Sequence, residues 1–129
     1  MSATEINFLR LDHHSVMSSD IEKSKFFYHN ILGLEIDTER PPLAYDGLWF
    51  KIADTPQALH CICLPNYDPV EDRPEHGGRD RHVALRISSL APLIAQLEAH
   101  DVFYTKSVSG RGAIFFRDPD GNAVEAIED

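Results

Sequence analysis

The sequence predicts an α+β fold made of two tandem βαβββ modules. One observation is the order of the expected elements, because a strand, a helix and three strands follow one another twice. A second is the correspondence of Asp12-His13, at the start of the first set, with Arg81-His82 at the start of the second. A third is the correspondence of residues 48–60, LWFKIADTPQALH, with residues 114–125, IFFRDPDGNAVE, which differ by one inserted residue. Since each module has few strands and one apolar face, we expect a curved, barrel-like mixed sheet around a shared space.

The composition and charge narrow the class of protein. The chain has 129 residues, 43% of them hydrophobic and 26% charged, which is typical of one globular domain. Its formal net charge of −9 argues against nonspecific binding of nucleic acid, because the phosphate backbone would repel it. Cys61 and Cys63 are too close in sequence for an ordinary disulfide framework, which indicates a reducing compartment. Without a signal-peptide pattern or an apolar run near the roughly 20 residues of a membrane span, we expect a cytoplasmic protein that binds no membrane.

The first module is expected over residues 8–65. Its helix should begin near Ser19, which has the spacing of a capping box with Glu22, or near Asp20, a competing N-cap. Gly33 is a suitable C-terminal stop for that helix. Alternating or β-rich segments predict the strands, which are expected at residues 8–17, 34–39, 48–53 and 58–64.

A segment dense in proline, glycine and charge is expected to be a linker over residues 66–80. The second module follows over residues 81–129. Leu90, Leu93, Ile94 and Leu97 recur with helical spacing and predict a helix over residues 89–102. The remaining segments predict strands, which are expected at residues 81–88, 103–109, 112–118 and 122–128.

Four side chains at equivalent places of the repeat point to a metal site. His13 and His82 lie on the first strands of the two modules, and His60 and Glu125 lie on the last strands. All four are metal-ligand types, and a duplicated sheet would bring them together near its pseudo-twofold axis. Three imidazoles and one carboxylate suit Zn, Ni, Fe, Co or Mn, whereas Mg or Ca would prefer more oxygen ligands. The sequence therefore predicts one divalent transition metal ion per site.

Nearly the whole chain resembles the vicinal oxygen chelate superfamily, which includes glyoxalase I, extradiol dioxygenases and the fosfomycin- and bleomycin-resistance proteins. The stretch LDHHSVMSSDIEKSKFFYHNILGLEI is similar to the opening motif of that family. RHVALRI resembles its second histidine strand, and FRDPDGNAVE resembles its closing turn and glutamate. Within the superfamily, the chain is most similar to a glyoxalase I-like subgroup.

The resemblance implies that His13, His82 and Glu125 are metal ligands and that Glu125 acts as the catalytic base. The fourth family position is glutamate in many bacterial glyoxalase I enzymes, and here it is His60. The implied function is a lyase or isomerase of the lactoylglutathione lyase type, acting on a small substrate that chelates the metal through vicinal oxygens. Glutathione or another thiol is a candidate co-substrate. The implied assembly is a homodimer, with the site either within one chain or shared between two.

Two other functions stay open at this point. If His60 is not a ligand, the remaining two histidines and one glutamate resemble the facial triad of Fe(II) dioxygenases. The other alternative is a non-catalytic protein that binds a small molecule or drug, as resistance proteins do.

Several further residues are candidates for contacts around the site. Trp49 or Phe115 could wall an apolar cavity, and Arg111 could hold a substrate carboxylate or phosphate, as could Arg73 and Arg79. Because neighbouring strand residues point to opposite faces, His14 should point away from the face that carries His13. The same alternation turns Cys61 and Cys63 away from His60, so we expect both cysteines to be small packing residues.

Overall fold

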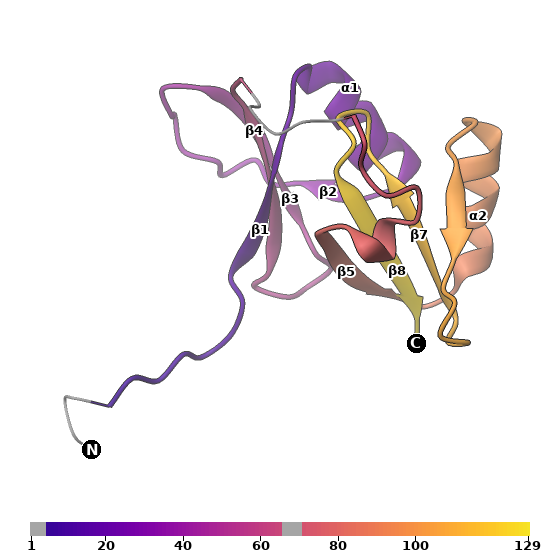
Figure 1. Ribbon diagram of the computed structural model, residues 1–129. Helices are drawn as coiled ribbons and strands as arrows, with labels where there is room; N and C mark the ends of the chain where they lie inside the picture. The colour runs from indigo at the N-terminus through magenta and orange to yellow at the C-terminus, as the bar shows by residue number, and fades with distance from the viewer. Residues whose placement is uncertain (1–4, 66–70) are drawn as a thin grey trace.

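The computed structural model describes residues 5–65 and 71–129 (Figure 1). Within them, no helix is long and apolar enough to cross a membrane. The first half of the chain contains β1 (His13–Met17), α1 (Ile21–Lys25), the π-helix η1 (Phe26–Ile31), β2 (Glu35–Ile36), β3 (Asp46–Lys51) and β4 (Ala58–Cys63). The second half contains the 3₁₀-helix η2 (Gly77–Arg79), β5 (His82–Ile87), α2 (Leu90–Ala99), β6 (Tyr104–Lys106), β7 (Ala113–Arg117) and β8 (Ala123–Glu128).

The strands form two four-stranded sheets with the same topology. Their orders are β1-β4-β3-β2 and β5-β8-β7-β6. In each sheet the first strand pairs in parallel with the last, and the other pairs are antiparallel. The predicted α+β fold with two βαβββ modules is therefore confirmed. The expected barrel is not closed, because the described strands form no ladder that joins one sheet to the other.

The strand registers confirm the alignment of the two modules. Trp49 lies opposite His60 on β3 and β4, and Phe115 lies opposite Glu125 on β7 and β8. The first strands agree as well, because His13 pairs with Ala58 and His82 pairs with Ala123, each two residues before the His60 or Glu125 position. The side chains that the sequence alignment of the two modules places at equivalent positions thus occupy equivalent register positions in the two sheets.

One face of each sheet packs against helices and forms the core. The α1 helix contacts β3 and β4, and α2 contacts β8 and η1. Alternation along the strands sends every second residue into this core, where Phe50 and Leu59 come from the first sheet and Ile114 and Val124 from the second. His60 and Glu125 are each next to core residues on their strands. Each therefore lies on the face of its sheet that points away from the core.

Strand boundaries in the first module differ from the expected ones, whereas the helix begins after Asp20, one of its two expected N-caps. The first strand begins at His13 rather than at residue 8, and residues 5–12 extend away from the body of the molecule (Figure 1). The N-cap of α1 is Asp20, whose carboxylate accepts from the backbone N–H groups of Glu22 and Lys23. The backbone N–H of Ser19 donates instead to Asp120 Oδ1 at 3.0 Å. Gly33, at φ +78°, follows the π-helix in the left-handed conformation that suits glycine at this place.

Part of the predicted linker is a structured strap, defined here as residues 73–80. Residues 66–70 of that linker lie outside the described residues. In Figure 1 the strap crosses in front of the strands of the second sheet. Gly77 is buried at the closest approach, where an added Cβ would lie 3.3 Å from Phe115 Cβ and 3.4 Å from Ala123 Cβ. The face of the second sheet that carries Glu125 is therefore covered by the chain's own strap.

Candidate functional site

His82 and Glu125 form the most strongly organised pair among the predicted site residues. His82 Nδ1 lies 2.8 Å from the backbone carbonyl of Asp80, and Nε2 lies 3.1 Å from Glu125 Oε1. A carbonyl oxygen only accepts, so Nδ1 carries a hydrogen and the neutral ring has its lone pair at Nε2. That lone pair faces another acceptor, a carboxylate oxygen. Two acceptors this close need a proton or a cation between them.

The second oxygen of Glu125 is held by an arginine. Arg111 donates from its terminal amino group to Glu125 Oε2 at 2.7 Å. The Glu125 side chain is only 2% exposed, whereas that of Arg111 is 55% exposed. The buried carboxylate therefore has one oxygen paired with a guanidinium and the other directed at His82. Arrangements of this kind orient a ligating carboxylate from outside the metal's own ligand set.

The equivalent residues of the first module form a stack of aromatic rings. The His60 ring is stacked on Trp49 with centroids 4.1 Å apart and on His13 with centroids 4.0 Å apart. His13 Nδ1 lies 2.7 Å from Asp12 Oδ2, so a carboxylate fixes its donor side and leaves Nε2 for another partner. Burial lowers the pKa of His60, and the nearby His13 lowers it further. His60 is therefore biased toward the neutral form that binds metal ions.

The four predicted ligands occupy two separate pairs in this chain. His13 meets His60, and His82 meets Glu125, but no group of three histidine, cysteine, aspartate or glutamate side chains within the described residues is placed to hold a metal ion. The chemistry of the donors fits a divalent transition metal, because the imidazoles of His13 and His82 each have Nδ1 fixed and Nε2 available. The 3.1 Å between His82 Nε2 and Glu125 Oε1 also suits two neighbouring ligands of one ion.

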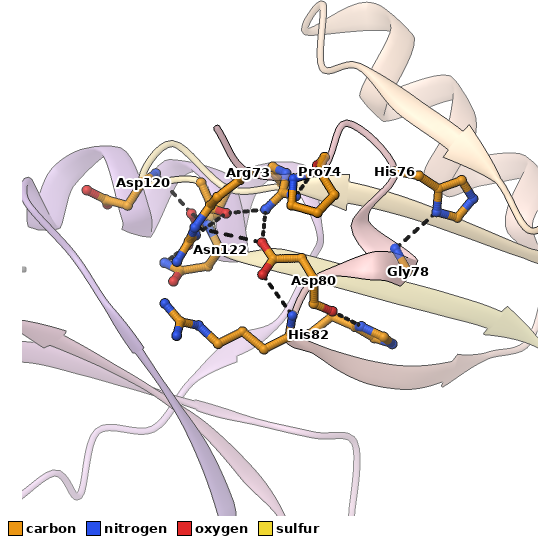
Figure 2. Close-up of polar contacts among 12 residues, drawn as sticks. Arg73, Pro74, His76, Gly78, Asp80, His82, Asp120 and Asn122 are labelled. Carbon is orange, nitrogen blue, oxygen red and sulfur yellow. Dashed lines mark hydrogen bonds and ion pairs between the residues drawn. The ribbon is translucent and has the colours of Figure 1, made fainter. Parts of the chain in front are cut away.

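The strap positions His82 through Asp80, a residue that the sequence analysis did not select. Figure 2 shows Asp80 between Arg73 and His82. Arg117 donates to Asp80 Oδ2 at 2.8 Å, and Arg73 Nε lies 3.8 Å from the same oxygen. The hydrogen bond from Arg117 is the main cause that lowers the pKa of Asp80. The only sequence signal for this role was the acidic residue two positions before a candidate ligand.

The other candidate residues have varied surroundings. Phe115 is 6% exposed and lies between two histidine rings, with centroids 4.8 Å from His76 and 5.3 Å from His82. Cys61 is a buried free thiol, and burial raises its pKa to about 12, which fits the predicted packing role. His14, for which no site role was expected, lines the clefts between β1 and β5 together with His82.

Comparison with known proteins matches residues 10–126 to the model of the Glyoxalase/Bleomycin resistance protein/Dioxygenase superfamily. Glyoxylase I 4 of Arabidopsis thaliana is 26% identical over 93% of this chain and 71% of its own length. A lactoylglutathione lyase of Salmonella typhimurium is 27% identical over 93% of this chain and 93% of its own length. Among solved structures, a glyoxalase family protein from Bacillus anthracis has a TM-score of 0.74 at 21% identity, with 97% of this chain and 99% of the other covered. At that identity the structural match establishes the fold alone.

Proposed function

The chain belongs to the Glyoxalase/Bleomycin resistance protein/Dioxygenase superfamily, and we propose that it is a metal-dependent lyase or isomerase of the glyoxalase I type. Its substrate would be a small molecule that chelates the metal through vicinal oxygens, with glutathione or another thiol as candidate co-substrate. The observation that carries this proposal is the pair of acceptors formed by His82 Nε2 and Glu125 Oε1, 3.1 Å apart. A divalent cation bound by both atoms satisfies them together.

The residues proposed to hold the metal are His82 and Glu125 from the second module and His13 and His60 from the first. Because the two pairs are separate in one chain, we propose that a second copy completes the site, so that each pair faces the other pair of its partner. The half-exposed first-module pair supports this arrangement, since the His13 side chain is 40% exposed. The active form would then be a homodimer. Comparison of the metal lost when each pair of ligands is mutated would test whether His60 belongs to the ligand set.

When bound, the metal would polarise the substrate oxygens and stabilise negative charge that develops on them. The chain's own contribution would be proton transfer at Glu125 Oε1, the oxygen that Arg111 leaves free, when this oxygen is displaced from the metal. The guanidinium on Oε2 fixes the orientation of the carboxylate, so that Oε1 faces His82. Phe115 and the strap keep water from this carboxylate, which is only 2% exposed.

Metal analysis of the purified protein tests the proposal. We expect a stoichiometric transition metal, or stoichiometric uptake of Zn, Ni, Fe, Co or Mn by calorimetry, and near-complete loss of it in His82→Ala. His100→Ala is the matched control, because His100 ends α2 on the exposed surface. Sedimentation of the same samples measures the dimer. A wild-type protein that takes up none of these metals, or a His82→Ala variant that keeps its metal, would overturn the proposed function.

A ring-cleaving Fe(II) dioxygenase is the second candidate function. His13, His82 and Glu125 are two histidines and one carboxylate, and the stacking of His60 between two rings favours a ligand set without it. An oxygenase would bind Fe(II) preferentially and lose activity without oxygen, whereas a lyase would be indifferent to oxygen. Turnover assays under air and under argon distinguish the two.

A further inference from the structure

A cavity beside Glu125 has a lining that the metal site does not explain. It has a volume of about 530 Å³ and lies between the strap and the loop that precedes β7. Phe115 forms an apolar part of its lining, and Arg111, which reaches Glu125 at 2.7 Å, lines it as well. A cavity of this size accommodates a small-molecule ligand. We call it the arginine pocket, after Arg79 and Arg111 in its lining.

The arginine pocket contains guanidinium donors that the described residues leave unused. Within the described residues, the Arg79 guanidinium has no hydrogen-bond or ion-pair partner. Arg111 uses one terminal amino group for Glu125, and no other contact of its guanidinium occurs among the described residues. Glu75 also lines the cavity, yet it pairs with neither arginine within those residues. In a chain with 21 acidic and 12 basic residues, an arginine without a carboxylate partner among the described residues, beside a second arginine with unused donors, needs an explanation.

Hydroxyl groups add further donors at the same place. Ser107 Oγ and Ser109 Oγ lie 2.7 Å apart, and the backbone N–H of Ser109 donates to Ser107 Oγ at 3.3 Å. One hydroxyl hydrogen is used between the two serines, so the other is available to a ligand. Both side chains line the cavity with Arg111. The cavity therefore has a free serine hydroxyl beside two guanidinium groups, which is an arrangement that suits an anion.

We propose that the arginine pocket binds an oxyanion, a carboxylate or a phosphoryl-type group, at one end of the substrate. Guanidinium groups pair with such groups through two parallel N–H donors. Phe115 would contact an apolar middle part, and the opposite end would reach His82 and Glu125. This orientation rests on the proposed function, but binding of the anion does not. The substrate class is thus a small organic acid with a metal-chelating end and an anionic end.

Titration of the metal-free, full-length protein with simple anions tests the pocket separately from the metal site. The probes are phenylphosphonate and phenylacetate, with neutral phenylacetamide as the comparison, followed by calorimetry and by NMR of the arginine side chains. We expect saturable binding of at least one anion and at least tenfold weaker binding in Arg79→Gln and in Arg111→Gln. Arg86→Gln is the matched control, because Arg86 is an exposed arginine on β5 that does not line the cavity. This control should bind like the wild type.

The outcomes separate the pocket from the proposed function. Binding of an anion that Arg79→Gln abolishes supports the pocket even if the protein takes up no metal, and the tighter of the two anions identifies the preferred head group. Three results would overturn the proposed anion site. They are binding of phenylacetamide as tight as that of the anions, no saturable binding of either anion, and unchanged binding in both variants. If Arg111→Gln fails to fold, Arg79→Gln decides the question alone, since the Arg79 guanidinium has no bond to the rest of the described chain.

Discussion

The imidazole of His60 lies flat on the indole of Trp49, with 4.1 Å between ring centroids and 3° between the ring planes. His13 covers the other side of His60 at 4.0 Å, so the ring is enclosed by aromatic neighbours on both faces. Burial, followed by the charge of His13, lowers the pKa of His60 below its usual 6.5. The site position on the last strand of the first module therefore holds a histidine that resists protonation.

This stack predicts a dependence of stability on pH. Because the folded-state pKa of His60 is depressed, the unfolded chain binds the proton more readily, and the stability gained above pH 6.5 is lost as the pH falls through and below that value. In thermal unfolding between pH 8 and pH 5, we expect His60→Gln to lose less stability on acidification than the wild type. The emission of Trp49, the single tryptophan, should change over the same pH range and stop doing so in the variant.

His14→Gln is the control for that experiment. Burial lowers the pKa of His14 as well, so this variant measures how much of the acid effect arises at the neighbouring histidine. His14 has no ring contact with Trp49, so its variant should keep the fluorescence titration. A wild-type acid response in His60→Gln would mean that the stack does not disfavour the charged ring.

A second prediction concerns the support of His82 by Asp80. Asp80→Asn removes the negative charge that Arg117 and Arg73 share, while the Asp80 carbonyl stays bonded to His82 Nδ1 only if the strap keeps its place. We expect faster amide hydrogen exchange at Arg79 and roughly tenfold weaker metal binding by calorimetry, since residues that orient a metal ligand typically contribute this much.

Asp72→Asn is the matched control, because Asp72 is exposed and adjoins the strap without these arginine contacts. It should leave both measurements unchanged.

Because the folded-state pKa of Asp80 is lowered, its stabilising contribution is present above the usual value of 3.8 and is lost as the pH falls through the lowered pKa. Wild-type exchange and affinity in Asp80→Asn would show that the strap is held by its packing on Phe115 and Ala123 instead.

A third prediction tests a buried hydrogen bond that joins the two modules. Tyr28 donates to Asp118 Oδ2 at 2.6 Å, and both side chains are buried. Tyr28→Phe should lower the free energy of unfolding by about 1.5–3 kcal/mol, as expected for a hydrogen bond to a charged group. Tyr104→Phe removes a similar bond, to Glu98 Oε1 at 2.8 Å, from an exposed site and should cost less. Denaturant unfolding of the two variants measures the difference.

The pH dependence of that prediction has a definite sign. Burial raises the pKa of Asp118, and the bond from Tyr28 opposes this by favouring the charged carboxylate. The penalty of Tyr28→Phe should therefore be greatest above the pKa of Asp118 and shrink as the pH falls below it. An equal penalty at all pH values would mean that Asp118 does not change its charge over the range tested.

Much of the architecture could be predicted from short stretches of sequence. The period of two along a strand placed His60 and Cys61 on opposite faces, and the helical spacing of Leu93 and Leu97 placed both in the core. The repeat then related His82 and Glu125 to His13 and His60, and the strand registers agree with that relation. Patterns of this kind depend on the backbone geometry that each segment adopts locally. They can therefore be recognised without knowing which other segment of the chain packs against it.

The sequence by itself determined the two modules, the faces of their strands and the four residues proposed as ligands. Only the tertiary structure decided that these residues form two pairs, that His60 is stacked between rings, that Arg111 holds Glu125 and that Asp80 supports His82 through the strap. The physical reason is distance along the chain. The side-chain conformations and the path of the strap depend on packing between segments that the sequence pattern cannot place in space, since no local periodicity relates residue 80 to residue 117 or residue 28 to residue 118.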